Sequence, residues 1–553
     1  MLKPYGGRGG YGRADHPSHV RLSDEISVLR LLSIGFPIVF LTVGTFMTNA
    51  VLSRLLALQR EQIAILKAFG FPNRQIMVHY LKFAIVMVAG GMAIGTVGCL
   101  ILGRQMLSMY HRFFRFPVLE FRPEYQAFVL AIGVSVAAAI LGVIHSVRTA
   151  ARLPPAEAMR PAPPANYRPA WLERTGIGRF LSHTFRIAAR NLQRKPGQAL
   201  LTITGLALAT GILIVPNCIR DGVDEVMDFQ WDTIQRQTLS LGLDEPSSGK
   251  IGDELAHLPG VRAVEPVRAA FVRLSHDQRQ RQLAIQGMPA VGLLNRVLGK
   301  DGHQIELPSE GLVVSSKLAE ILGARVGDQL VVEVLEDKRP TFPVRLAGLA
   351  DDFAGVTAYM DIHALNRLLD EGQVISGASL DIDAAYRDQF LTALKEIPHI
   401  SWVAIKDSLR ENFRQSTAAN IGVLQSIYLS FALIVAFGVI YNNARISLAE
   451  RARELATLRV IGFSRREVGG VLVTELVLLA LAAVPLGLLL GTGFATGIIR
   501  SVNTETVRLP LVLTTNNYAF AVLVVVVAST ISALVVLRKM NQLDLVGALK
   551  APE

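Results

Sequence analysis

The sequence predicts a polytopic α-helical membrane protein with seven spans, an internally duplicated three-helix repeat and an inserted α+β domain outside the cytoplasm. Three observations predict this fold class. Hydrophobic residues make up 51% of the 553 residues and charged residues only 18%, whereas about 25% charged residues is usual in soluble proteins. Seven apolar stretches are each long enough to cross a bilayer, which takes about 20 residues. One long interval, residues 220–414, is too polar to lie in a membrane and must fold in water.

Each predicted span is a stretch without Lys, Arg, Asp or Glu that lies between two charged residues. The stretches lie between Arg30 and Arg54, Lys82 and Arg104, Glu124 and Arg148, Lys195 and Arg220, Arg414 and Arg445, Glu475 and Arg500, and Arg508 and Arg538. The chain is therefore expected to consist of three spans, a linker, one span, a domain and three further spans.

Basic residues in the short loops indicate the side of the membrane, because cytoplasmic loops are enriched in Lys and Arg. One set of loops carries 24 basic residues and the other set carries 11. The C-terminus is therefore expected in the cytoplasm, and residues 1–30 and 220–414 are expected on the extracytoplasmic side. The same bias accounts for the net charge of +11, so the lipid bilayer is an expected partner and nucleic acid is not.

The chain contains two copies of one unit. A shift of 392 residues superposes residues 62–76 (QIAILKAFGFPNRQI) on residues 454–468 (ELATLRVIGFSRREV), each just before a Gly-rich span. Matches at the same place relative to three successive spans indicate a duplication. The predicted organisation is an N-terminal segment 1–30, a first three-helix repeat 31–147, a cytoplasmic linker 148–195, a transmembrane helix 196–219, the α+β domain 220–414, a second three-helix repeat 415–537 and a cytoplasmic tail 538–553.

Motifs for catalysis or metal binding are absent from the sequence. There is no G-x-x-x-x-G-K-[ST] phosphate loop, so the chain is not expected to be its own ATPase. There is also no H-E-x-x-H zinc pair, no G-x-S-x-G nucleophile motif and no Cys or His cluster at ligand spacing. We therefore expect that the chain is not an enzyme and binds neither a metal nor a cofactor.

The motifs of both repeats resemble those of permease subunits of the MacB, FtsX and lipoprotein-releasing class of ABC transporters, often called type VII. The resemblance rests on the two loops above, on RNLQRKPGQALLTITGLALA around the start of the fourth span, on EGLVVSSKLAEILGARVGDQLVVEV in the domain, and on LPPAEAMRP and LDLVGALKAP after the repeats. Permeases of this class have four spans per half, with an extracytoplasmic domain between the first and second. The resemblance implies that this chain lacks the first span and first domain of its N-terminal half.

The resemblance also implies a function in the bacterial inner membrane. A separate ATPase subunit dimer would bind ATP and dock on the cytoplasmic face. Its ATP hydrolysis would move the extracytoplasmic domain, for export or extraction of a lipid, lipoprotein or hydrophobic compound. The resemblance also allows two further partners, which are a second permease copy and a periplasmic adaptor protein. The alternative is an FtsX-like scaffold that regulates an extracytoplasmic enzyme without transport, although the duplicated repeat favours transport.

The strongest candidate site is the pair of cytoplasmic loops that precede the Gly-rich spans. Ala64, Leu66 and Ala68 alternate with charged residues, which suggests an amphipathic helix, and Gly70 and Gly462 are expected at the C′ positions of their helices. In the family such loops are coupling helices that dock on the ATPase, whereas their composition equally allows helices that lie on anionic lipid. The candidate residues are Arg60, Glu61, Gln62, Lys67, Gly70, Arg451, Arg453, Glu454, Arg459 and Gly462.

Two further features lie within the spans. Gly91 and Gly95, like Gly487 and Gly491, have GxxxG spacing, which lets helix backbones approach closely and predicts helix packing. Glu475 is a candidate intramembrane polar site, because an ionisable residue in a span often has a function. The alternative, favoured by its place only a few residues past the cytoplasmic loop, is that its side chain reaches water.

Patterns within residues 220–414 predict mixed α+β structure. Alternation of apolar residues predicts strands at 267–274, 282–287, 329–334 and 344–349, and helical periodicity predicts helices at 316–322, 362–369 and 387–395. Gly327 and Asp328 are expected to form a turn before the third strand. Residues 405–415 continue into the fifth span without Pro or Gly, which favours a rigid helical stalk over an ordinary connector.

Overall fold

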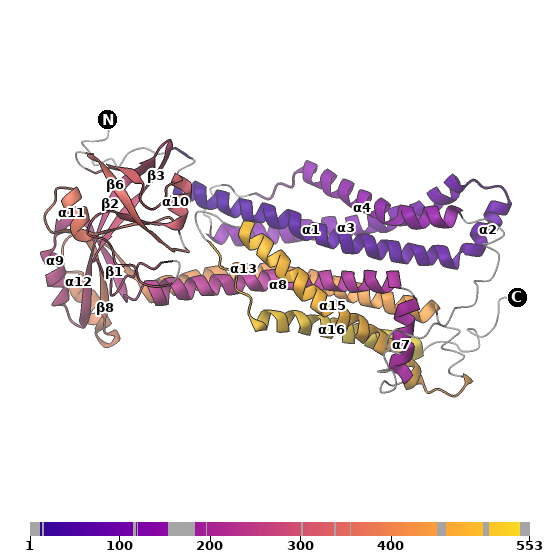
Figure 1. The fold of residues 1–553 in the computed structure, drawn as a ribbon. Helices are drawn as coiled ribbons and strands as arrows, with labels where there is room; N and C mark the ends of the chain where they lie inside the picture. Colours follow the sequence, from indigo (N-terminus) through magenta and orange to yellow (C-terminus); the bar gives the residue numbers. More distant parts are fainter. Residues whose placement is uncertain are drawn as a thin grey trace. The chain divides into compact units, whose positions relative to one another are not determined.

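The computed structural model describes residues 12–13, 16–113, 118, 120–152, 183–194, 196–299, 302–336, 339–353, 355–450, 460–501 and 508–541. Contacts divide the chain into two compact units (Figure 1). The first, which we call the domain unit, comprises Met1–Leu31, Ile219–Ala419 and Gly497–Val512. The second, which we call the membrane unit, comprises Leu32–Cys218, Asn420–Thr496 and Leu513–Glu553.

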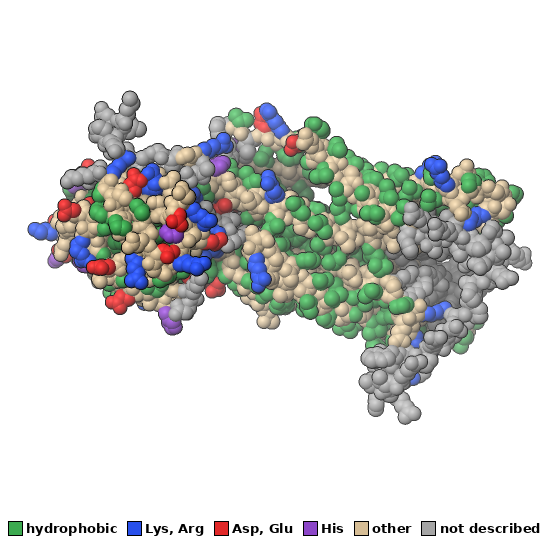
Figure 2. Space-filling model, turned by 45° about the horizontal axis from the view of Figure 1, so that its top comes forward, with side chains coloured by type: hydrophobic (Ala, Val, Ile, Leu, Met, Phe, Trp, Pro, Cys, Tyr) green, Lys and Arg blue, Asp and Glu red, His purple; other side chains and the backbone are tan. Residues whose placement is uncertain are grey.

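Seven of the described helices are long and apolar enough to cross a membrane, which confirms the predicted number of spans. They are α1 (Pro17–Leu58), α3 (Asn73–Phe113), α4 (Tyr125–Arg152), α8 (Pro196–Asp228), α13 (Lys406–Glu450), α15 (Arg465–Ser501) and α16 (Thr515–Asn541). Hydrophobic side chains cover the visible surface of the long helices, whereas Lys, Arg, Asp and Glu gather over the strands (Figure 2). Since lipid tails cannot hydrogen-bond, helices with an apolar surface are a stable way for backbone to cross a bilayer.

The two repeats meet along α1 and α13, which are equivalent helices in the duplication. The ring of Phe36 stacks on that of Tyr428 with centroids 4.0 Å apart, and the centroids of Phe40 and Phe431 lie 5.4 Å apart. The partners are 392 and 391 residues apart in the chain, which is the offset that superposes the two sequence copies. Because the residue numbers of the contacting partners increase together along both helices, α1 and α13 run parallel. Contact between equivalent positions indicates a pseudo-two-fold axis between the repeats.

α8 packs on the second repeat. Its residues Leu206 and Ala209 belong to one apolar cluster with residues of α13, α15 and α16. Near one end of this contact, the hydroxyl of Thr202 donates to Oδ1 of Asn443 at 3.2 Å. The other buried members of the cluster are Ala436, Ile440, Ala444, Leu476, Ala483, Val525 and Ala528.

The α+β domain contains a nine-stranded sheet in the part of the chain that the structure describes. The strand order is β3-β7-β4-β6-β5-β2-β8-β1-β9, and β3 also pairs with β2. The strands are β1 (Leu239–Ser248), β2 (Val261–His276), β3 (Arg279–Met288), β4 (Leu312–Ser315), β5 (Gln329–Val334), β6 (Thr341–Ala350), β7 (Ala358–Asp361), β8 (Val374–Ile382) and β9 (Ile400–Ile405). The accompanying helices are α9 (Lys250–Ala256), α10 (Ser316–Leu322), α11 (Ile362–Leu368) and α12 (Arg387–Leu394), and a π-helix (Phe229–Ile234) follows α8.

Strand β2 runs through both halves of the sheet. Between residues 261 and 267 it pairs with β8, and from residue 268 to 276 it pairs with β3. One apolar core, which includes Ile285, lies beside the second half, and another, which includes Phe390, lies beside the first. Strand β2 therefore joins these two apolar cores.

The structure contains the predicted strands β2, β3, β5 and β6 and the predicted helices α10, α11 and α12. Gly327 has a φ of +105°, as the predicted turn requires. The sequence patterns did not reveal β1, β4, β7, β8, β9 or α9. Every residue of β4 and β7 is buried, so neither strand alternates between apolar and polar residues. A short apolar run of this kind does not distinguish a strand from a buried helix.

Candidate functional site

The first predicted coupling loop contains the short helix α2 (Arg60–Ala68). Gly70 follows it with a φ of +89°, a left-handed conformation that glycine adopts without steric strain. The N–H of Gly70 donates to the carbonyl of Lys67 at 2.9 Å, and the N–H of Phe71 donates to the carbonyl of Leu66 at 3.1 Å. These two bonds form a Schellman motif, so Gly70 occupies the C′ position.

Helix α2 buries one side and exposes another. Ile63 packs in an apolar cluster with residues of α1 and α3, and Ala64 beside it is also buried. Phe69 is 78% exposed. The exposed large apolar residues of this loop are Ile65, Leu66, Phe69 and Phe71. Such a group of exposed apolar side chains is typical of a surface that contacts a protein or lipid partner.

The alternation of Ala64, Leu66 and Ala68 suggested that these residues line one face of α2, and this prediction is wrong. Ala64 is buried, whereas Leu66 and Ala68 are exposed. Residues two apart on an α-helix point about 200° apart around its axis, so an alternating pattern cannot line a single face. The buried pair instead consists of the neighbours Ile63 and Ala64.

The charged residues predicted for coupling are only partly within the described chain. Gln62 is exposed and Lys67 is half-buried. Arg60 and Glu61 belong to α2 by their backbone, but their side chains lie outside the description. The predicted second-loop residues Arg451, Arg453, Glu454 and Arg459 lie outside the described residues.

The described end of the second loop has the same features as the first. Gly462 has a φ of +109°. Val460, Ile461 and Phe463 are exposed. Phe463 lies 392 residues after Phe71, so an exposed phenylalanine follows a left-handed glycine in both copies.

Gly487 and Gly491 of α15 lie close to α8. A Cβ at Gly487 would lie 2.6 Å from the Cβ of Thr210, and a Cβ at Gly491 would lie 2.8 Å from the Cα of Gly211. The close helix approach expected from GxxxG spacing is therefore present at this pair.

Gly91 and Gly95 of α3 are in a different environment. A Cβ at either position would have no described atom within 4 Å. The helix packing predicted for this pair is therefore not formed by the residues that the structure describes. GxxxG spacing permits close approach, but it does not supply the second helix.

Glu475 of α15 is only 6% exposed. The adjacent Leu476 belongs to the apolar cluster that α8 forms with α13, α15 and α16. The carboxyl group is thus enclosed by protein in this structure and does not extend into water. An ionisable group enclosed within a span stays a candidate for coupling.

A polar cluster, which we call the clasp, joins one end of α8 to one end of α13 within the domain unit. Arg410 donates from Nη1 to Asp232 at 2.9 Å and from Nη2 to Asp228 at 3.1 Å. Nζ of Lys406 donates to the carbonyl of Trp231 at 3.0 Å. These five residues define the clasp. In the sequence, the acidic residues Asp228 and Asp232 are four residues apart, and so are the basic residues Lys406 and Arg410. This i, i+4 spacing, which places both members of a pair on one helix face, was the only sign of the clasp in the sequence.

A second contact, which we call the Arg508 junction, joins the segment between α15 and α16 to the α+β domain. It consists of Asp352, Phe353 and Arg508. The N–H of Arg508 donates to the carbonyl of Phe353 at 2.8 Å, and its Nη2 donates to the carbonyl of Asp352 at 2.7 Å. α8 lies beside the same segment, since a Cβ at Gly222 would lie 3.0 Å from the carbonyl oxygen of Pro510. In the sequence, Arg508 appears only as the charged residue at the start of the last apolar stretch, and nothing there indicates its contact with the domain.

The carboxyl group of Asp352 is buried at this junction. It accepts hydrogen bonds from the hydroxyls of Thr357 and Tyr359, the latter at 3.0 Å. Burial raises the pKa of Asp352 above its ordinary value, although the hydroxyl donors and the Arg508 guanidinium act in the opposite direction. A carboxyl group with a raised pKa makes the junction sensitive to pH.

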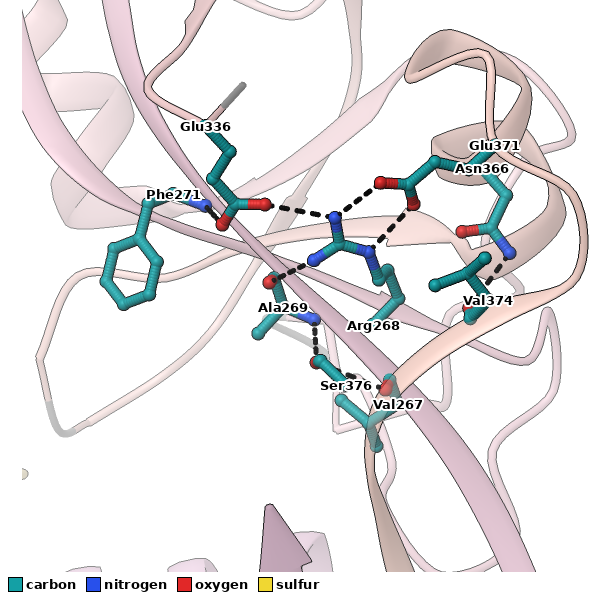
Figure 3. Close-up of polar contacts among 9 residues, drawn as sticks. All are labelled: Val267, Arg268, Ala269, Phe271, Glu336, Asn366, Glu371, Val374 and Ser376. Carbon is teal, nitrogen blue, oxygen red and sulfur yellow. Dashed lines mark hydrogen bonds and ion pairs between the residues drawn. The ribbon is translucent and has the colours of Figure 1, made fainter. Parts of the chain in front are cut away.

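Arg268 ties the two halves of the sheet together where β2 passes from one to the other (Figure 3). Its side chain is 2% exposed. It donates to Glu371 from Nε at 2.9 Å and from Nη2 at 2.8 Å, and to Glu336 from Nη2 at 3.0 Å. Glu371 precedes β8, and Glu336 follows β5. Because the buried guanidinium is satisfied by both carboxylates, we infer that it holds the two halves in one relative geometry.

The described side chains do not include a group of three or more His, Cys, Asp and Glu that could hold a metal ion. Within the described part of the chain, Cys99 and Cys218 are not in a disulfide, and the first is exposed and the second buried. The candidate sites among the described residues are therefore contact surfaces and ion pairs.

The fold is that of a multi-pass membrane protein with a duplicated helical repeat. Residues 34–155 and 426–545 each match the FtsX-like permease C-terminal domain, which confirms the duplication. The chain is also 24% identical over 341 residues to an uncharacterized ABC transporter permease protein of Mycobacterium tuberculosis. Both repeats therefore resemble FtsX-like permeases, and the chain is similar to an ABC transporter permease.

The extents of these similarities differ. The match to the mycobacterial permease covers 59% of this chain and 39% of that protein. The periplasmic region of MacB from Actinobacillus actinomycetemcomitans is 12% identical with a TM-score of 0.25, and the match covers 34% of this chain and 97% of that one. The extracellular domain of the ABC-type transporter YknZ from Gram-positive bacteria is 12% identical with a TM-score of 0.23, and the match covers 31% of this chain and 98% of that one.

Proposed function

We propose that this chain is the permease subunit of an ABC transporter in the bacterial inner membrane, driven by a separate ATP-hydrolysing subunit. The main support is the duplicated loop before α3 and α15. In both copies a left-handed glycine, Gly70 or Gly462, is followed by an exposed phenylalanine, Phe71 or Phe463. A permease that is driven by an ATPase needs such a contact surface for its partner.

The loops are suited to a dimeric ATPase. Ile65, Leu66 and Phe69 are exposed around the half-buried Lys67, so the α2 loop offers apolar contact area beside a positive charge. Two equivalent loops related by pseudo-two-fold symmetry match the two equivalent subunits of a dimer. Docking of the α2 loop would place the C-terminus in the cytoplasm and the α+β domain outside, as the basic residues of the loops indicate.

Two connections would carry movement to the α+β domain. α13 is one helix from Lys406 to Glu450, so it links the clasp directly to the second loop. The Arg508 junction links the segment after α15 to the domain. A displacement at the loops would therefore act on the domain through a continuous helix and through a separate contact.

The proposed substrates are lipids, lipoproteins or other hydrophobic compounds that the moving domain exports or extracts. A second permease copy and a periplasmic adaptor are further proposed partners. The duplicated repeat favours this transport function over a scaffold that only regulates an enzyme.

Affinity purification of the tagged chain from its native membranes tests the ATPase contact. We expect an ATP-binding subunit and its ATPase activity to co-purify with the chain. The double variant Phe71→Glu/Phe463→Glu should reduce recovery of that subunit about tenfold, because a charge in the centre of an apolar contact is costly to desolvate. Both phenylalanines are exposed, so the change should leave the fold intact.

The matched control is Val326→Glu, which places the same charge at an exposed apolar position of the α+β domain. Recovery of the ATP-binding subunit should be unchanged with this control. Undiminished recovery with the double variant would contradict docking through these loops. It would favour loops that lie on anionic lipid, which liposome binding of the same variants would detect.

A further inference from the structure

The last strand of the described sheet, β9, exposes a tryptophan. The side chain of Trp402 is 54% exposed. β9 stands at the end of the strand order, next to β1, and its sequence ISWVAI contains no charged residue. The indole is therefore accessible to a large ligand that approaches this edge of the domain.

The indole ring of Trp402 lies flat on β1. A Cβ at Gly242 would collide with Nε1 and Cε2 of the ring and would lie 2.8 Å from Cζ2. The three distances together place that point over a face of the ring. A glycine within a strand often marks such a close approach of another group to the backbone. One face of the indole is thus held against the sheet, and the opposite face is open.

Polar groups of β1 lie around the indole. Leu241 and Leu243 belong to an apolar core on one face of the sheet. The residues beside them, Ser240, Gly242 and Asp244, therefore point to the opposite face, where the indole lies. These three positions carry a hydroxyl group, no side chain and a carboxylate, so they offer hydrogen-bonding groups beside the ring and no further large apolar surface.

Asp244 is held in a fixed pair with His399. Nδ1 of His399 lies 3.2 Å from Oδ2 of Asp244, and the N–H of Asp244 donates to the carbonyl of His399 at 2.9 Å. His399 has a φ of +73°, which is uncommon for a residue other than glycine. Desolvation would raise the pKa of Asp244, but hydrogen bonds from His399 and from the N–H of Glu245 lower it. The carboxyl group is therefore an ionised acceptor.

We propose that this face of β1 and β9 binds a saccharide, with a pyranose ring stacked on the indole of Trp402 and its hydroxyl groups bonded to Asp244 and His399. The face of an indole is electron-rich and attracts the C–H groups on the flat side of a sugar ring. A carboxylate accepts hydrogen bonds from hydroxyls, and an imidazole can donate or accept. Asp244 lies two strand residues, about 7 Å, from Gly242, a distance that a single sugar ring spans. The site therefore fits pyranoses with equatorial hydroxyls, such as β-1,4-linked glucose or N-acetylglucosamine.

The composition of this face favours a saccharide over a protein partner. Tryptophans at the centre of protein interfaces are surrounded by further contacts that exclude water. Here the neighbours on β1 are small or polar, and Ala404, which pairs with Ser240, is the other β9 residue on this face. A single flat ring with hydrogen-bonding groups at its rim suits a ligand that has both C–H faces and hydroxyls. The binding does not depend on the proposed ATPase-driven function.

Saturation-transfer NMR on the full chain in lipid nanodiscs tests the proposal. The probes are chitotetraose and cellotetraose, and maltoside detergents are avoided because they themselves present sugar rings. We expect transfer from the protein to ring C–H protons of at least one tetrasaccharide. The control ligand is sorbitol, an open-chain polyol that has hydroxyl groups but no ring face, and it should give no transfer.

Four variants then locate the bound tetrasaccharide. Trp402→Leu should lower the affinity about tenfold, whereas Trp402→Phe, which keeps a ring face, should lower it by less than about threefold. Gly242→Ala keeps the indole but places a methyl group where the ring lies, so it should also lower the affinity about tenfold. The matched control is Tyr386→Leu, which removes another exposed aromatic ring of the same domain and should leave the affinity unchanged.

Several results would overturn the proposal. They are the absence of transfer to both tetrasaccharides, equal transfer to sorbitol, unchanged affinity in Trp402→Leu, and an equal loss in Tyr386→Leu. If Trp402→Leu unfolds at a lower temperature than the unaltered chain, the comparison of Trp402→Phe with Gly242→Ala decides, and equal affinities of these two variants would contradict stacking. A benzophenone amino acid at the exposed position Ser401 that captures a protein in native membranes, without saccharide binding, would indicate a protein interface instead.

Discussion

At the scale of single residues, two buried charged groups in the α+β domain differ in how they are satisfied. Arg268 meets two carboxylates, which lie 68 and 103 residues further along the chain. Asp352 meets mainly hydroxyl donors, and burial raises its pKa. The sequence showed neither arrangement, because both depend on residues that only the fold brings together.

Replacing Arg268 by methionine should strongly destabilise the domain. The change leaves two carboxylates without their cation, and breaking a buried ion pair costs about 3–5 kcal/mol. Because Glu336 and Glu371 are partly exposed, we expect a loss of about 3 kcal/mol, at the lower end of that range. Urea unfolding of the purified chain, followed by tryptophan fluorescence, measures the loss.

The control for this prediction is Arg273→Met. Arg273 pairs with Glu333 at a partly exposed site, where an ion pair contributes about 1 kcal/mol or less. A loss of stability as large as that of Arg268→Met would contradict a special role for the buried cluster.

Asp352→Asn should change how stability depends on pH. Its folded pKa is raised above the unfolded value, so the folded state binds the proton more tightly. The resulting stabilisation is complete below the unfolded pKa and is lost as the pH rises through the folded pKa. Asp352→Asn should therefore raise the unfolding temperature at neutral pH and remove this part of the pH dependence, as thermal unfolding at a series of pH values would show.

Asp383→Asn provides a comparison in which the pKa of the carboxyl group is shifted in the opposite direction. The backbone N–H of Ala385 and the side chain of Arg262 lower the pKa of Asp383. Its stabilisation is present above the unfolded pKa and is lost as the pH falls through the folded pKa. If both variants shifted the pH profile in the same direction, burial would not be the dominant influence on Asp352.

At the scale of elements, equivalent helices of the two repeats differ in their neighbours. α3 and α15 both carry GxxxG spacing, but only α15 has α8 against its glycines. GxxxG spacing therefore accompanies close helix contact in the second repeat, whereas in the first repeat no described helix contacts the glycines.

Gly487→Leu should weaken the packing of α8 on α15. Its Cβ alone would lie 2.6 Å from the Cβ of Thr210, and overpacking of this kind typically costs about 1–3 kcal/mol. Gly497→Leu on the same helix is the control, because a Cβ there has no described atom within 4 Å. We expect only the first variant to lower the unfolding temperature in detergent. Equal unfolding temperatures would show that α8 does not pack here.

At the scale of the whole molecule, single helices contribute residues to both units. α13 contributes Lys406–Ala419 to the domain unit and its remaining residues to the membrane unit. The clasp and the Arg508 junction belong to the domain unit, and each involves residues next to membrane-spanning stretches. We therefore expect these contacts to matter more for coupling than for the assembly of either unit.

Arg508→Leu should uncouple ATP hydrolysis from transport. The change removes the side-chain bond to the carbonyl of Asp352 without touching the loops proposed for the ATPase. Allosteric couplings are typically about 1–3 kcal/mol, so we expect transport to fall about tenfold while ATP hydrolysis is retained. Parallel assays of both activities in vesicles measure the ratio.

Arg500→Leu is the control for the junction. Arg500 is an exposed basic residue in the last turn of α15. It should leave the ratio of transport to hydrolysis unchanged. Equal effects of Arg500→Leu and Arg508→Leu would point to the loss of a positive charge and away from the hydrogen-bonded junction.

Much of the fold could be predicted because it depends on short stretches of sequence. Hydropathy revealed the seven spans, alternation revealed β2 and β5, and Gly70 marked the end of α2. Prediction failed where burial hid the periodicity, as in β4 and β7, and where alternating residues were assigned to one face of α2. The clasp, the Arg508 junction and the Arg268 cluster were not predicted, because each joins distant segments.

The sequence by itself determined the membrane class, the number of spans and the duplication, since hydropathy and repeat spacing are properties of the chain alone. Only the tertiary structure decided which equivalent positions are packed. Gly95 and Gly487 occupy the same place in the repeat, yet α8 lies against Gly487 and no described helix lies against Gly95. The physical reason is that close packing depends on the atoms across the contact, and a residue's own sequence neighbourhood does not specify them.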